Sequence, residues 1–143
     1  YFVTAVRTDR KLRNIAWQID SAGNIVRKGS ADAGSIDLLD AVYVGEGYFV
    51  TAVRTDRKLR NIAWQIDSAG NIVRKGSADA GSIDLLDAVH VGEGYFVTAV
   101  RTDGKLRNIA WQIDSAGNIV RKGSADAGKV SQISIESATN LSC

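Results

Sequence analysis

The chain has 143 residues, 45% of them hydrophobic and 24% charged, with a formal net charge of +2. This composition is typical of a globular domain and excludes a disordered chain. The uncharged apolar stretches are far shorter than the roughly 20 residues that a membrane-spanning helix needs, and acidic residues balance the basic ones instead of leaving a one-signed patch. We therefore expect neither a membrane nor a nucleic acid among the partners.

An internal repeat of 47 residues dominates the sequence. Tyr1–Gly47 matches Tyr48–Gly94 at every position except one, where Tyr43 is replaced by His90. A period of this length is typical of β-propeller blades, but helical armadillo and HEAT units have similar lengths. The residues within the unit must therefore decide between strands and helices.

The third copy starts at Tyr95 and follows the second through Gly128, with Gly104 in place of Arg57, and then diverges. Near-identity of the copies indicates recent amplification or design of one unit. We predict three blades, at residues 1–47, 48–94 and 95–141, of which the third has a divergent outer strand at 129–137 and is followed by a tail at 142–143.

The first segment of the second copy, residues 48–55, predicts a strand, because it is rich in aromatic and β-branched residues and has no helical period. The turn that follows it, at residues 56–58, contains an Asp-Gly pair in the third copy, Asp103 and Gly104. Such a pair between two apolar runs is the strongest short-range signal for a β-hairpin.

The second segment, residues 59–67, is ambiguous. Ile62, Trp64 and Ile66 alternate as they would in a strand, but the apolar positions also fit one face of a helix. A compact turn and the β-type residues 72–75 follow at once and leave about nine residues for a helix. We therefore favour a strand.

The last segment, residues 82–89, has the weakest strand pattern of the four. Its divergent counterpart supports a strand, because Ser131, Ile133 and Ile135 alternate with polar residues in a serine-rich stretch that is poorly suited to a helix. Four short strands with turns at near-even spacing, repeated along the chain, predict an all-β protein built from four-stranded antiparallel propeller blades.

Four runs of the repeat carry a likeness to a known family: residues 35–42, 50–55, 59–64 and 72–77. They resemble blades of bacterial β-propellers of the lectin-like and tectonin-like kind. The resemblance implies that glycans bind in clefts between neighbouring blades. Together with the small side chain of Ala52, it also implies that strand 48–55 lies innermost in the blade and strand 82–89 outermost.

Three blades leave an apolar flank open at each end of the array, because each blade buries its faces against its neighbours. Propellers close with about 4 to 8 blades. Since the copies are nearly identical, the last blade of one chain fits the first blade of another in a heterologous interface that closes by rotation. We expect a six-bladed homodimer, with a nine-bladed trimer less favoured and a fragment of a longer propeller as the alternative.

Each unit has one tryptophan, on its second strand: Trp17, Trp64 and Trp111. As core residues they would pack between blades, and as binding residues they would line clefts and stack on a sugar face. Ile15 and Ile19 flank Trp17 on the same strand face, which favours the core. The three tryptophans nevertheless remain candidate ligand-binding residues.

One arginine ends the first strand of each unit: Arg7, Arg54 and Arg101. In a closed ring these residues would place guanidinium groups around one mouth of the channel, where they would bind carboxylates or phosphates through bidentate hydrogen bonds. The alternative is that each arginine pairs with a nearby aspartate such as Asp9, Asp56 or Asp103.

No residues predict catalysis or metal binding. His90 is the only histidine and Cys143 the only cysteine, and neither has partners at the spacing of a metal site or a catalytic triad. Asp37 and Asp40 are three apart and point to opposite faces of a strand, so they cannot pair as acid and base. Residues 67–70 predict a plain turn in which the aspartate bonds its own backbone.

The sequence therefore predicts a non-enzymatic binding or scaffold protein without metal or cofactor, a symmetric oligomeric propeller with weak multivalent sites for a glycan or a small anion. The alternative is a structural product of recent blade amplification or design with no evolved ligand. Identical copies offer identical sites and supply no complementary set of acid, base and nucleophile, which disfavours an enzyme.

Overall fold

The computed structural model describes residues 1–138, which form β-strands and their connections without a helix. This confirms the predicted all-β class and shows that the ambiguous segment 59–67 is a strand. Within these residues no helix is long and apolar enough to span a membrane. The strands are β1 (Phe2–Thr8), β2 (Lys11–Ile19), β3 (Ile25–Ser35), β4 (Leu38–Gly45), β5 (Tyr48–Thr55), β6 (Lys58–Ile66), β7 (Ile72–Ser82), β8 (Leu85–Gly92), β9 (Tyr95–Thr102), β10 (Lys105–Ile113) and β11 (Ile119–Lys129).

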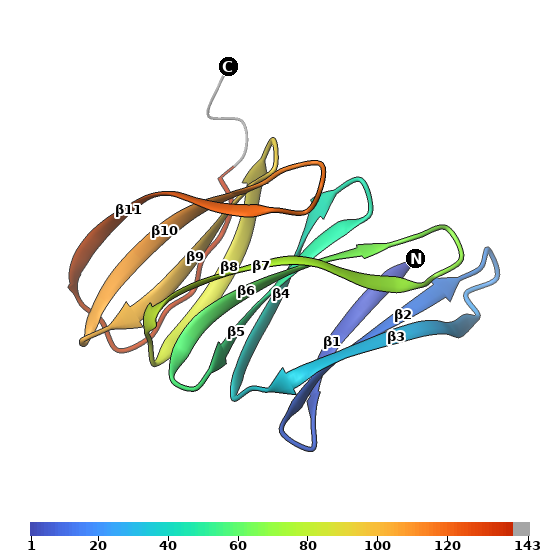
Figure 1. Cartoon of the computed structure of the whole chain (residues 1–143), viewed down its shortest axis with the longest axis horizontal. Helices are drawn as coiled ribbons and strands as arrows, with labels where there is room; N and C mark the ends of the chain where they lie inside the picture. Colours follow the sequence, from blue (N-terminus) through green and yellow to red (C-terminus); the bar gives the residue numbers. More distant parts are fainter. Residues whose placement is uncertain (139–143) are drawn as a thin grey trace.

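The strands form three antiparallel sheets that lie side by side in chain order (Figure 1). The first sheet has the order β1-β2-β3, the second β4-β5-β6-β7 and the third β8-β9-β10-β11. Their registers repeat one another: Phe49 lies opposite Trp64 in the second sheet as Phe96 lies opposite Trp111 in the third. The repeated sheets form a propeller-like architecture, and residues 1–138 of a single chain do not close a ring.

Each four-stranded sheet takes its first strand from the preceding repeat. β4 belongs to the first copy of the repeat and pairs with β5 of the second, and β8 pairs with β9 in the same way. The sheets are thus offset by one strand from the sequence repeat. The predicted order within a blade is wrong, because residues 48–55 form a second strand and residues 82–89 lead into β8, a first strand. β4 and β8 make the most extensive contact between different sheets, so these first strands lie where the sheets converge.

Two-residue turns explain this order. Glu46 and Gly47 have positive φ angles of 56° and 79°, which is the geometry of a type I′ hairpin turn, and such a turn joins only neighbouring antiparallel strands. β4 therefore lies directly beside β5. Asp56 and Arg57 repeat this geometry between β5 and β6, with φ angles of 53° and 68°. In the third copy Gly104 takes the second turn position at a φ of 77°, which confirms the predicted Asp-Gly hairpin.

Two apolar cores fill the junctions between the sheets. Leu12 of the first sheet shares a core with Phe49 and Trp64 of the second. Leu59, on the opposite face of the second sheet, shares the other core with Phe96 and Trp111 of the third. Each junction therefore combines a leucine face of one sheet with a Phe–Trp face of the next.

The outer strand predicted at residues 129–137 is not formed, because β11 ends at Lys129 and residues 130–138 contain no strand. A strand there would need a following strand equivalent to β5 or β9 as its hydrogen-bonding partner, and the described residues hold none after β11. The predicted tail at 142–143, with Cys143, lies outside the described residues.

Candidate functional site

The tryptophans of the second and third sheets are core residues. Trp64 is 1% exposed, its Nε1 donates to Thr51 Oγ1 at 2.9 Å, and its ring stacks on Phe49 with 6.4 Å between centroids. Trp111 repeats this environment. Buried rings offer no free face to a sugar. Trp17 makes the same contacts within its own sheet but is only half-buried, because no sheet covers it within the described part of the chain.

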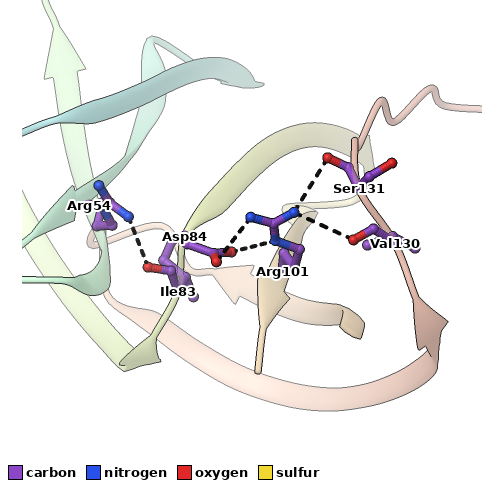
Figure 2. A network of polar contacts seen from close by, with 6 residues as sticks. All are labelled: Arg54, Ile83, Asp84, Arg101, Val130 and Ser131. Carbon is purple, nitrogen blue, oxygen red and sulfur yellow. Dashed lines mark hydrogen bonds and ion pairs between the residues drawn. The ribbon is translucent and has the colours of Figure 1, made fainter. Parts of the chain in front are cut away.

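Two of the three candidate arginines are held by aspartates. Arg54 donates from Nε and Nη2 to the two carboxylate oxygens of Asp37, at 2.8 and 2.9 Å, and from Nη1 to the carbonyl oxygen of Ile83 at 3.2 Å. Arg101 binds Asp84 in the same bidentate way, at 2.7 and 3.1 Å (Figure 2). The partners stand just before β4 and β8 and are not the turn aspartates expected from the sequence.

These ion pairs shift the acidity of both partners. The hydrogen bonds from Arg54 hold the pKa of Asp37 below its usual value, and those from Arg101 do the same for Asp84. The pKa of each guanidinium is raised in turn. Both arginines therefore stay charged with that charge already compensated, which reduces their attraction for an added anion.

Arg7 differs from its two counterparts. It lies on β1, which has no preceding strand in its sheet and hence no aspartate in the position of Asp37. Its Nε donates to the carbonyl oxygen of Ile36 at 2.8 Å, its side chain is exposed, and it forms no ion pair with any residue that the structure describes. The Nη groups of Arg7 therefore remain available to an anion.

A polar groove of about 500 Å³ lies between the second and third sheets, around Arg54 and Arg101. Arg57 adds a third positive charge, and three aspartates balance them. The charged lining residues are Asp37, Arg54, Arg57, Asp84, Arg101 and Asp103. Because the two signs balance, this groove suits a neutral polar ligand better than an ion.

An apolar cleft of about 580 Å³ lies between the first and second sheets. Phe2 and Val3 of β1 line one wall, and Val42 and Tyr43 of β4 line the other. The Tyr43 side chain is 61% exposed. The cleft opens beside the edge of β1 that carries no neighbouring strand.

The remaining sequence candidates have structural roles or none. Asp67 accepts hydrogen bonds from the amides of Ala69 and Asn71 at 2.9 Å, so the predicted plain turn is confirmed, and these bonds lower the pKa of Asp67. His90 Nε2 is buried without a hydrogen-bonding partner in the described chain. Within residues 1–138 no three metal-ligating side chains cluster.

A carboxyl pair that sequence reasoning missed lies where β4 meets β8. Asp40 hydrogen-bonds Asp87, and Asp40 Oδ2 accepts from the amide of Ala88 at 2.8 Å. Burial is the largest cause that raises the pKa of Asp40 to about 6, and the hydrogen bond to Asp87 is the second. Asp87 accepts that bond, which lowers its pKa. Asp37 and Asp40 do not pair with each other. Asp40 pairs instead with Asp87, its counterpart in the next copy of the repeat, and the repeat was the sequence feature from which this pairing could have been predicted.

We expect stability to fall as the pH rises from about 4 to 7. The folded chain binds the Asp40 proton more tightly than the unfolded chain, so the stabilisation is complete below about pH 4 and is lost as the pH rises through about 6. Asp40→Asn keeps a hydrogen-bond donor without a charge. It should raise the free energy of unfolding at pH 7 by about 1 kcal/mol, allowing for solvent screening at this half-buried site.

Urea titrations at pH 4.5, 6 and 7.5 measure this effect. His90→Tyr, which restores the residue of the first copy, serves as the common background because it removes the only imidazole. A pH dependence that survives Asp40→Asn unchanged would contradict the assignment.

No protein-family model, curated protein or solved structure matches the chain. The structure itself shows an array of repeated antiparallel sheets in a propeller-like arrangement, with specific contacts at the junctions between the sheets.

Proposed function

We propose that this chain is a non-enzymatic repeat protein that closes into a symmetric β-propeller with further copies of itself and serves as a binding scaffold. Two chains supply six blades, which lies within the usual range of about 4 to 8, and three chains supply nine. The ligand is a small anion, or a glycan that carries an anionic group. The likeness of the repeat to lectin-like and tectonin-like propeller blades is consistent with this class.

The observation that carries the anion proposal is the contrast between Arg7 and its counterparts. Arg54 and Arg101 each donate two hydrogen bonds to an aspartate, whereas Arg7 is exposed and donates one hydrogen bond to a carbonyl oxygen. A guanidinium recognises carboxylate, phosphate or sulfate through two parallel hydrogen bonds. One such residue per chain gives one site per chain, and a symmetric ring converts weak sites into multivalent binding.

Titration calorimetry with inorganic phosphate and with a sulfated oligosaccharide tests this site. Arg7→Ala should weaken binding at least roughly tenfold, because a charge-assisted hydrogen bond contributes about 1.5–3 kcal/mol. Arg60→Ala is the matched control and should leave affinity near that of the unaltered chain, since that guanidinium is already engaged by Asp79 through two hydrogen bonds. Equal affinity in the Arg7→Ala and unaltered proteins would overturn the site.

Two further measurements separate the proposal from the purely structural alternative. Light scattering after size exclusion should give the mass of two chains, and a single-chain mass at high protein concentration would overturn the closed ring. If the protein binds neither a glycan array nor phosphate, this result would favour a structural product of blade amplification with no evolved ligand.

A further inference from the structure

The two end faces of the array are unlike the same faces inside it. On the first sheet Phe2 is 38% exposed, whereas its counterparts Phe49 and Phe96 are 4% and 0% exposed. Trp17 is half-buried, and the equivalent Trp64 is 1% exposed. Because the local sequences are identical, the difference arises from the missing neighbour and not from the residues themselves.

The opposite end shows the complementary deficit. Leu12 and Leu59 are fully buried at the two internal junctions, but their counterpart Leu106 on the third sheet is only half-buried. Asn61 is likewise fully buried while Asn108 is exposed. The third sheet therefore ends in an uncovered leucine face, and the first sheet begins with an uncovered Phe–Trp face. Inside the chain these two faces cover each other.

Residues 130–138 follow the path of a first strand although they pair with none. The amide of Ile135 donates to Asp87 Oδ2 at 3.1 Å, as the amide of Ala88 donates to Asp40 Oδ2 at 2.8 Å one repeat earlier. Arg101 Nη1 reaches the carbonyl oxygen of Val130 at 3.5 Å, and Arg54 reaches Ile83 in the same way (Figure 2). Residues 130–138 thus occupy the position of a first strand, as β4 and β8 do, but the described chain contains no further sheet that this strand could begin.

We propose that residues 130–138 of one copy pair with β1 of a second copy, so that two copies complete each other's first sheet. The inference rests on the ring of the proposed function and specifies its interface. The register follows from the pairing of β4 with β5, in which Asp40 lies opposite Ala52: one repeat away, Ser134 lies opposite Ala5. The incoming strand fills the apolar cleft between β1 and β4, as β4 itself lies between β5 and β8.

A close backbone approach marks the outer part of the same interface. A Cβ on Gly29 would clash with the carbonyl oxygen of Gly70, and one on Gly76 would lie 2.5 Å from that of Gly117. Gly123 occupies the equivalent position on the third sheet, where a Cβ meets nothing within 4 Å. In the closed ring its neighbour is the turn of the second copy that holds Gly23.

Gly123→Ala therefore separates assembly from folding. The single chain has room for the methyl group, so circular dichroism should be unchanged, but the variant should elute with the mass of one chain. Gly128→Ala is the matched control, because its counterparts Gly34 and Gly81 at internal positions also have free space. Acrylamide should quench one of three tryptophans, Trp17, in the Gly123→Ala protein and none in the control. Full assembly of Gly123→Ala would overturn the interface.

Cross-linking tests the strand register separately. In a Cys143→Ser background, Ala5→Cys with Ser134→Cys should form an intermolecular disulfide, since opposed residues of antiparallel strands lie within disulfide reach. Ala5→Cys with Ile135→Cys is the mismatched control, because adjacent residues point to opposite faces. A two-chain mass without preferential cross-linking of the first pair would overturn the strand pairing and leave the ring standing, and a single-chain mass would overturn both.

Discussion

Replacing Trp64 by alanine should lower the free energy of unfolding by about 3–5 kcal/mol, the range measured for large-to-small aromatic substitutions in protein cores. The indole ring is 1% exposed, stacks on Phe49 and spends its Nε1 on Thr51. Its loss opens a cavity at the junction of the first two sheets and leaves the Thr51 hydroxyl without this partner. Urea denaturation followed by circular dichroism measures the change.

Trp17→Ala is the matched control, since the residue has the same neighbours within its sheet but is only half-buried in the single chain. At protein concentrations where the chain is unassembled, Trp17→Ala should lower the free energy of unfolding much less than Trp64→Ala does. The difference should narrow at high concentration, where assembly covers Trp17. Equal destabilisation in dilute solution would contradict the role of sheet–sheet burial.

The strands and turns were largely predictable because the local signals agree with one another. Aromatic and β-branched residues predict β5, and the Asp-Gly pair at residues 103–104 predicts the hairpin between β9 and β10. The turn aspartate Asp67 was also identified from its residue type and setting. These features depend on residues close in sequence, whose backbone preferences suffice to define them.

Strand order was not predictable from strand content, because a repeat of nearly identical copies can be divided at any point. A division at Tyr1 and Tyr48 separates β4 from β5, although the Glu46–Gly47 turn across that boundary joins the two strands as a tight hairpin. A two-residue connection also links β7 to β8, but there the chain crosses to the next sheet. Telling the two connections apart requires the packing of neighbouring sheets, which a single unit does not encode.

The arginines of the candidate site could be predicted from the sequence, but the aspartates that pair with them could not. Arginines at the end of the first predicted strand were identified, but Asp37 and Asp84 reach Arg54 and Arg101 only because β4 and β8 cross into the following sheet. Arg7 is set apart because the described chain places no such strand beside β1, and the segment that we propose to pair with β1 has Ser131 in the position of Asp37 and Asp84. The distinction between a compensated and an available guanidinium is therefore a property of the sheet order.

Gly76→Ala is expected to destabilise the chain strongly although it adds a single methyl group. The added Cβ would lie 2.5 Å from the Gly117 carbonyl oxygen, and a backbone atom in a hydrogen-bonded turn cannot move aside as a flexible side chain can. Overpacking of this kind costs about 1–3 kcal/mol or more, and here it would push the second and third sheets apart. Urea denaturation of the single chain measures the loss.

Gly81→Ala places the same methyl group on the same strand, at a position with nothing within 4 Å, and should change stability by no more than about 0.5 kcal/mol. The comparison isolates the close approach from any intrinsic preference of β7 for glycine. Gly76 and Gly123 then form a matched pair, in which the first residue faces a neighbour in its own chain and the second faces one in another copy. Equal stability of Gly76→Ala and Gly81→Ala would contradict the role assigned to the close approach at this junction.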